Sequence, residues 1–172
     1  VFAPGDEVVV LPSGFSTTIE AIDGPGGEPV DEAFSPMAVT LRLADDLDVG
    51  RGDLIARAGN HPVVDQDVDA TVCWLSDQDR LAPGRRYTLK HTTRTVKAMV
   101  ADLAYRLDVN TLHRDQSATE LALNEIGRVR LRTQAPLLFD EYRRNRETGS
   151  FILVDDVTHA TVAAGMITGV GR

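Results

Sequence analysis

Residues 137–156 read LLFDEYRRNRETGSFILVDD, and this stretch joins a charged turn to the most apolar strand candidate of the chain. The segment from Asn145 to Gly149 is rich in turn-forming residues, and Gly149 can adopt a positive φ at no steric cost. The run from Phe151 to Val154 is short, apolar and rich in residues that favour strands. This junction predicts a hairpin or a loop-to-strand connection in an all-β domain.

The first third of the chain consists of short apolar runs separated by turn residues, a spacing typical of antiparallel β-structure. The strands expected there are Glu7–Leu11, Phe15–Ile22, Met37–Leu43 and Asp53–Arg57. Turn formers cluster again at residues 59–62, where the residue before Pro62 is biased away from helical conformation. The sequence therefore predicts two units, residues 1–62 and residues 63–172.

The second unit is expected to continue the same rhythm of strands and turns. Its expected strands are Asp69–Leu75, Arg86–Thr93, Leu121–Asn124, Ile126–Thr133, Phe151–Val154 and His159–Ile167. Val72 and Trp74 share one face of their strand by the alternation of side chains, and Cys73 is expected to pack as a small buried hydrophobe. The only helix expected is a short one near Phe139–Arg144.

Composition limits the possible partners and compartments. The chain has 172 residues and a net charge of −8, with 26 acidic residues against 18 lysines and arginines, so binding to a phosphate backbone is disfavoured. The single cysteine cannot form an internal disulfide, and no run approaches the roughly 18 apolar residues of a membrane helix. We expect a cytoplasmic protein with no membrane or nucleic-acid partner. Because the sequence starts with Val1 and lacks an initiator Met, we expect a fragment of a longer chain.

A search for catalytic motifs yields no site residues. The chain contains neither the GxxxxGK[ST] phosphate cradle nor an NKxD segment, and Asp23–Gly26 matches DxxG only within a loop that reads as a plain turn. The tripeptide Arg51-Gly52-Asp53 is likewise interpreted as a turn. We therefore expect no catalytic residue, no cofactor-binding residue and no metal ligand in this chain.

The remaining polar residues also have ordinary interpretations. Neighbouring carboxylates on a strand point to opposite faces, which argues against acid–base pairs at Asp45/Asp46, Asp140/Glu141 and Asp155/Asp156. The four histidines, at positions 61, 91, 113 and 159, are spread along the chain without the spacing of a metal motif. The basic cluster Arg143-Arg144, Arg146 is interpreted as a solvated turn.

Several segments of the sequence carry a resemblance to a known family. NRETGSFILVDDVTHATVAAGMI, residues 145–167, resembles the third domain of the large, GTP-dependent subunit of sulfate adenylyltransferase, a relative of elongation factor Tu. GDEVVVLPSG, residues 5–14, and DVGRGDLIA, residues 48–56, resemble the second domain of the same family. The resemblance implies two small antiparallel β-barrels, the first lacking its first strand, with the GTPase domain absent.

The resemblance also implies a function for the parent protein. It would form adenosine 5′-phosphosulfate from ATP and sulfate, coupled to GTP hydrolysis, and these barrels would be non-catalytic scaffold. GTP and Mg²⁺ would bind in the absent domain, so no cofactor is expected in this fragment. The implied partners are the GTPase domain of the same polypeptide and the small catalytic subunit. Some members of the family carry an adenylylsulfate kinase domain, and a linker to one could begin within residues 168–172.

Residues 95–107 give conflicting signals. Their apolar residues fall at helical spacing, which favours an amphipathic helix: Val96, Met99, Val100, Leu103 and Leu107. No good N-cap and capping box precede them, and the segment runs into DVNTL, residues 108–112, which resembles the third-domain strand of the sulfurylase family and its exit. We therefore predict a strand.

The sequence leaves open an alternative function and the closure of the first unit. The alternative function is the barrel domains of a translation elongation-factor GTPase, which would contact aminoacyl-tRNA, and the acidic composition argues against it. The first unit offers only about four strands, fewer than a small closed barrel normally has. An open edge is a template for another chain, so we expect it to be covered by a second copy, a swapped segment or a rearranged loop, with self-association or a poorly ordered first unit as the outcome.

Overall fold

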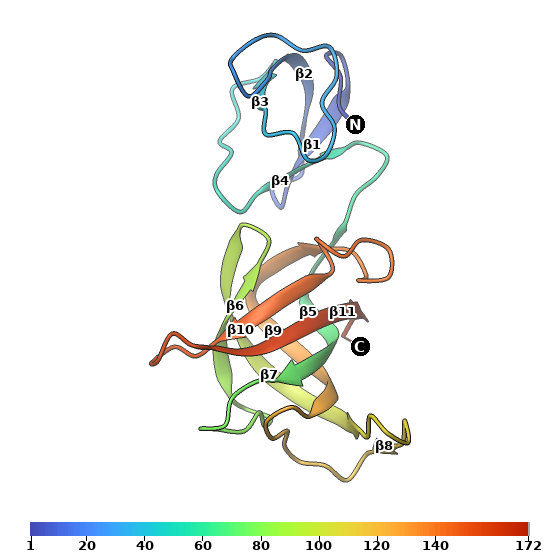
Figure 1. The fold of residues 1–172 in the computed structure, drawn as a ribbon. Helices are drawn as coiled ribbons and strands as arrows, with labels where there is room; N and C mark the ends of the chain where they lie inside the picture. Colours follow the sequence, from blue (N-terminus) through green and yellow to red (C-terminus); the bar gives the residue numbers. More distant parts are fainter. Residues whose placement is uncertain (172) are drawn as a thin grey trace. The chain divides into compact units, whose positions relative to one another are not determined.

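The computed structural model describes residues 1–171, and strands are the only regular elements in that range (Figure 1). The chain divides into two compact units, Val1–Pro62 and Val63–Arg172. All strand pairings between named strands are antiparallel. The all-β class predicted from the sequence is confirmed.

Unit 1 is one four-stranded sheet. Its strands are β1 (Glu7–Leu11), β2 (Phe15–Asp23), β3 (Thr40–Leu43) and β4 (Leu54–Arg57), in the order β3-β2-β1-β4. The core is small, with Val8, Ile19, Ile22 and Ala33 fully or almost fully buried. Within the described residues, β3 pairs only with β2 and β4 only with β1. The sheet is therefore open at both edges, as the count of strands predicted.

Unit 2 is a closed barrel with one short extra strand. Its strands are β5 (Val63–Trp74), β6 (Arg86–His91), β7 (Arg94–Leu107), β8 (Arg114–Asp115), β9 (Ile126–Phe139), β10 (Ser150–Val154) and β11 (Thr161–Val170). They follow the order β6-β10-β11-β5-β9-β7-β8, and an additional β6–β7 pairing closes the ring (Figure 1). Six strands thus form the wall, with no free edge among them.

On β5 and on the first half of β9, alternation of side chains separates the inside of the barrel from the outside. On β5, Val68, Ala70, Val72 and Trp74 are all 0% exposed, as are Val129 and Leu131 on β9. The residues between them face outward, where opposite charges pair across the two strands. Arg128 Nη2 lies 3.2 Å from Asp69 Oδ2, and Arg132 forms an ion pair with Asp67. On β9, the aliphatic residues are thus buried beneath the outward-facing arginines.

The strand prediction for residues 95–107 is confirmed by β7. Part of the helical spacing, the step from Val100 to Leu103, has a structural cause, because the register of β7 against β9 shifts between Val100 and Asp102 and again between Leu103 and Tyr105. Each bulge inserts one residue, so the buried residue after Val100 is Leu103 and not residue 102. A bulged strand can therefore imitate the period of a helix over one turn, while Met99 and Leu107, which pair with Arg132 and Ile126, lie on the outer face.

Two local predictions are wrong. Residues 139–144 form no helix, because β9 continues to Phe139 and its last residues, Leu137 to Phe139, pair with the start of β5. Leu121–Asn124 is not a strand, since only Leu121 forms a bridge, to Leu81, with backbone bonds of 2.8 and 3.0 Å. Asn124 then takes a φ of 64°, which ends any extended run. In both places long-range pairing overrides local preference.

Gly165 on β11 is required by a close approach inside the barrel. It lies directly opposite Phe151 of β10, and a Cβ built on Gly165 would lie 2.2 Å from Phe151 Cζ. Phe151 is only 4% exposed, so its ring has no room to move away. The aromatic ring thus occupies the space that a side chain at position 165 would fill.

We expect Gly165→Ala to destabilise unit 2 by about 1–3 kcal/mol, the usual cost of overpacking a well-filled core. Gly59→Ala is the matched control, since nothing lies within 4 Å of a Cβ at that position. Urea unfolding followed by circular dichroism measures both. Equal unfolding midpoints for the two variants would show that Phe151 does not constrain Gly165.

Candidate functional site

A row of mostly apolar side chains crosses the outer face of the unit 2 barrel. Directly paired residues carry it from strand to strand: Ile126 of β9, Cys73 of β5, Ala164 of β11, Ile152 of β10 and Lys90 of β6. Their strand neighbours point into the barrel, so this row faces outward. The prediction that Cys73 is buried is wrong, because Cys73 lies on this outer face and is only partly covered. The row is therefore an apolar strip with the side chain of Lys90 at its β6 end.

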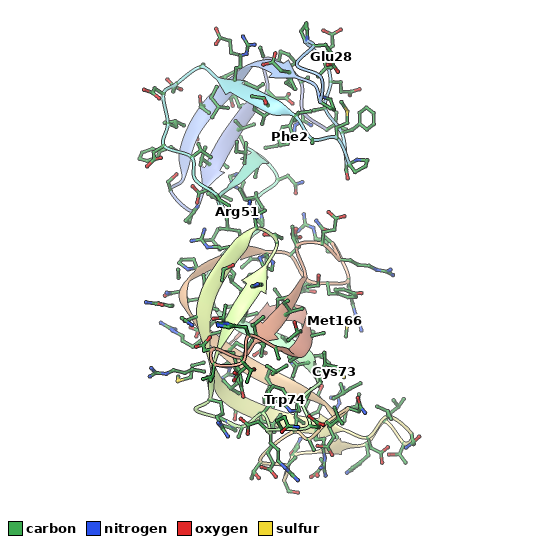
Figure 2. The ribbon with its side chains drawn as sticks, turned by 60° about the vertical axis from the view of Figure 1, so that its left-hand side comes forward. Phe2, Glu28, Arg51, Cys73, Trp74 and Met166 are labelled. Carbon is green, nitrogen blue, oxygen red and sulfur yellow. The ribbon has the colours of Figure 1, made fainter. Side chains whose placement is uncertain are left out.

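A cavity of about 880 Å³ lies over this strip and is walled in part by Tyr142 and Met166. Met166 is 41% exposed, so a large apolar side chain borders the cavity and is open to solvent. Figure 2 marks Cys73 and Met166, which both line the cavity. We call this cavity and the row beneath it the outer groove.

A second cavity of about 350 Å³ adjoins the outer groove. The two share three lining residues, Thr71, Tyr142 and Met166. The second cavity adds Arg128, Arg143 and Glu141, so charges of both signs surround the apolar floor. An apolar centre with a charged rim is the composition of a protein–protein contact surface.

The loop of residues 140–149 forms a fixed wall of the outer groove. The Tyr142 N–H donates to the Ile167 carbonyl at 2.9 Å, and the Ile167 N–H donates to the Gly149 carbonyl at 2.7 Å. A Cβ at Gly149 would lie 2.4 Å from Tyr142 Cα, so the glycine is required by close backbone contact. A positive φ, which the sequence suggested for Gly149, is not the reason.

His91 holds the other end of this loop. It is 1% exposed, and its Nε2–H donates to the Thr148 carbonyl oxygen at 2.7 Å. Burial lowers the pKa of His91 and the charge of Arg94 lowers it further, while the bond to Thr148 acts in the opposite direction. The neutral imidazole is therefore the form that fits the folded loop.

Two of the carboxylates singled out by the sequence, Asp155 and Asp156, have structural roles. Asp155 accepts hydrogen bonds from the Thr158 and Val157 N–H groups, at 2.7 and 2.9 Å, and these bonds lower its pKa. Asp156 lies 2.8 Å from Lys97 Nζ, which lowers its pKa. Within residues 1–171, no group of three or more His, Cys, Asp or Glu side chains is arranged to hold a metal ion.

The two short motifs of unit 1 are turns, as the sequence indicated. In the DxxG match, the Gly24 N–H donates to the Glu28 carbonyl and the Gly27 N–H to the Gly24 carbonyl. In the RGD tripeptide, Asp53 is tied to Gly50 by a backbone bond of 3.1 Å and by a carboxylate bond of 2.9 Å. Neither segment contributes to the outer groove.

Local sequence patterns did not predict the outer groove. Alternation along the strand places the Cys73 side chain on the face opposite to that of Val72 and Trp74. This was the signal in the sequence that Cys73 faces outward. Which residues of β9, β10 and β11 lie beside Cys73 depends on registers between distant segments, which no local pattern reveals.

Charge is distributed unevenly between the two units. Unit 1 carries 11 of the 26 acidic residues but only 3 of the 18 basic ones, while unit 2 carries the other 15 acidic and 15 basic residues. The whole net charge of −8 therefore resides in unit 1. In the described residues, no helix is long and apolar enough to cross a membrane.

Comparison with known proteins defines the family. The chain belongs to the GTP-eEF1A C-terminal domain-like family, whose model matches residues 67–168. It is 66% identical over 167 residues to the bifunctional enzyme CysN/CysC of Mycobacterium tuberculosis (strain ATCC 25618 / H37Rv), a match that covers 97% of this chain and 27% of that protein. It is 41% identical over 165 residues to sulfate adenylyltransferase subunit 1 of Alteromonas mediterranea, covering 96% of this chain and 34% of the relative.

These relatives confirm the resemblance to the sulfate adenylyltransferase family that the sequence indicated. The chain spans about a quarter to a third of their length. Among solved structures, Sup35 complexed with GMPPNP superimposes with a TM-score of 0.88 at 21% identity, covering 99% of this chain and 42% of that one. At this identity the likeness shows the fold alone.

The buried His91 predicts a pH dependence of stability. Its pKa is lower in the folded than in the unfolded state, so the unfolded state binds more protons between the two values. We expect stability to be highest above about pH 6.5 and to fall as the pH drops below it, with a slope of up to about 1.4 kcal/mol per pH unit.

Urea unfolding at pH 7.5 and at pH 5.5 measures this effect. His91→Gln keeps an N–H donor for the Thr148 carbonyl but cannot titrate, so it should reduce the slope. His113→Gln, at an exposed site, is the control and should leave the slope unchanged. An unaltered slope in His91→Gln would contradict the assignment.

Proposed function

We propose that this chain is the non-catalytic barrel portion of the GTP-dependent subunit of sulfate adenylyltransferase. The parent protein would form adenosine 5′-phosphosulfate from ATP and sulfate, coupled to GTP hydrolysis, in sulfate assimilation in the cytoplasm. The observation that carries the proposal is the 66% identity to CysN/CysC across 97% of the chain. The name of this relative, bifunctional enzyme CysN/CysC, also supports a parent protein that is fused to an adenylylsulfate kinase.

The barrels act in this proposal as a scaffold. GTP and Mg²⁺ bind in a part of the parent outside this chain, and the small catalytic subunit carries adenylyl transfer. The outer groove serves as the contact for the GTPase domain of the same polypeptide. Its apolar floor, its exposed Met166 and its mixed charged rim support this role. The relatives offer ample length for such an occupant, since about two thirds to three quarters of each lies outside the matched region.

Contact with aminoacyl-tRNA is the weaker alternative. The net charge of −8 in unit 1 repels a phosphate backbone, and unit 2 is neutral overall. Identity to a sulfate adenylyltransferase subunit 1 is 41%, against 21% to Sup35.

The functional proposal is tested in the full-length polypeptide together with the small subunit, by following pyrophosphate release from ATP and sulfate with and without GTP. The native proteins should show GTP-stimulated release. Met166→Asp places a charge in the outer groove, and we expect it to lower the stimulation by roughly tenfold or more, because a buried unpaired charge opposes docking.

Leu123→Asp is the matched control, since Leu123 is 45% exposed but lies outside the outer groove. It should retain the stimulation. No release by the native proteins would reject the proposed reaction. Equal loss in both variants, or in neither, would reject the role of the outer groove alone.

We further propose that the isolated chain self-associates through the open sheet of unit 1. A cavity of about 650 Å³ lies beside strands β3 and β4, and its lining includes Phe34 and Val49, which are 54% and 39% exposed. Unpaired edges and exposed apolar side chains favour pairing with a second copy. The charge of −8 on the same unit opposes it.

Static light scattering at several salt concentrations tests this self-association. We expect the mean mass to rise with protein concentration and to rise further with salt, because salt screens the repulsion between acidic units. A strict monomer at high protein concentration and high salt would contradict the proposal.

A further inference from the structure

One end of the unit 2 barrel contains a cavity of about 410 Å³ that is separate from the outer groove. Three segments meet there: the end of β5 with the loop that follows it, the start of β6, and the turn between β10 and β11. The end of β5 and its loop contribute Trp74 and Asp79, and the start of β6 contributes Tyr87. The turn between β10 and β11 contributes Asp155 and Val157. We call this space the end cavity.

The Tyr87 hydroxyl is the unusual group of the end cavity. Tyr87 is 3% exposed, and within residues 1–171 its hydroxyl oxygen has no hydrogen-bond partner. Burial raises the pKa of Tyr87 to about 12, and the carboxylates of Asp79 and Asp155 add to this, with Arg85 opposing. A buried hydroxyl without a partner is costly, so a bound group that pairs with it would be favoured.

Both carboxylates are held in fixed positions. Asp79 Oδ1 accepts from the Arg80 N–H at 2.8 Å and from Arg85 Nη2 at 2.7 Å. Asp155 Oδ1 accepts from the N–H groups of Val157 and Thr158. All these bonds go to Oδ1, and in the described residues Oδ2 of each carboxylate remains available as an acceptor.

The remaining walls of the end cavity are largely apolar. Trp74, Val157 and Val162 contribute to them. Trp74 is fixed by a bond of 2.8 Å from its Nε1–H to the Asp79 carbonyl, and its ring meets Tyr87 edge-on with centroids 5.6 Å apart. The cavity thus combines apolar walls with two carboxylates and a phenol oxygen.

We propose that the end cavity binds the side chain of a lysine or arginine from a partner protein. Such a side chain has an apolar stem and a cationic head that only donates hydrogen bonds, which matches the apolar walls and the three acceptor groups. An anion would be repelled by the two carboxylates. A bare metal ion would find fewer than three ligands of the usual kind. This proposal is independent of the outer groove and of the parent reaction.

The test uses Trp74, the only tryptophan of the chain, as the reporter. Its fluorescence is followed while the blocked amino acid N-acetyl-lysine N-methylamide is added, and the norleucine analogue, which has the same stem without the charge, serves as the control ligand. We expect a saturable change with the lysine compound, weakened by salt, and none with the norleucine compound.

Three variants assign the response to the end cavity. Asp79→Asn and Tyr87→Phe should each weaken binding of the lysine compound by roughly tenfold, since each removes one interaction with a charged group. Tyr87→Phe removes only an unpaired hydroxyl and should not lower the unfolding midpoint. Asp102→Asn, which makes the same charge change outside the end cavity, should bind like the native chain.

Several outcomes would overturn the proposal. Equal responses to the lysine and norleucine compounds would show that charge is not recognised. Native affinity in Asp79→Asn and Tyr87→Phe would place the binding elsewhere. No saturable response to the lysine compound would show that the cavity holds only water.

Discussion

The pairing of β6 with β7 is the contact on which the rest of unit 2 depends. The other pairings make a sheet that begins at β6 and extends to β7, and this last pairing turns the sheet into a ring. Closure leaves no unpaired edge in the wall and gives every strand a distinct inner and outer face. Unit 1 has no such contact, so its sheet remains open and its core small.

The closed wall explains where recognition surfaces can form. The interior is filled by fully buried aliphatic and aromatic side chains and has no room for a ligand. Recognition must therefore use the outer face, as in the outer groove, or the loops at the barrel ends, as in the end cavity.

Local sequence patterns predicted the strands well where alternation was regular. Glu7–Leu11 was predicted with the observed bounds, and Val72 and Trp74, which were predicted to share one face of their strand, are both fully buried. Prediction failed at residues 139–144, where pairing with the start of β5 extends β9, and at Cys73, whose surroundings come from three distant strands. The family resemblance supplied what periodicity could not, since it favoured a strand for the bulged β7.

Native-state hydrogen exchange tests the closed barrel most directly. If the β6–β7 contact closes a cooperative ring, the paired amides of β6 and β7 should exchange with the same opening free energy as those of β5 and β9. Amides at the β3 and β4 edges of unit 1 should exchange more readily. Opening of the β6–β7 contact at a markedly lower free energy than the rest of the wall would contradict the account, because unit 2 would then behave as an open sheet.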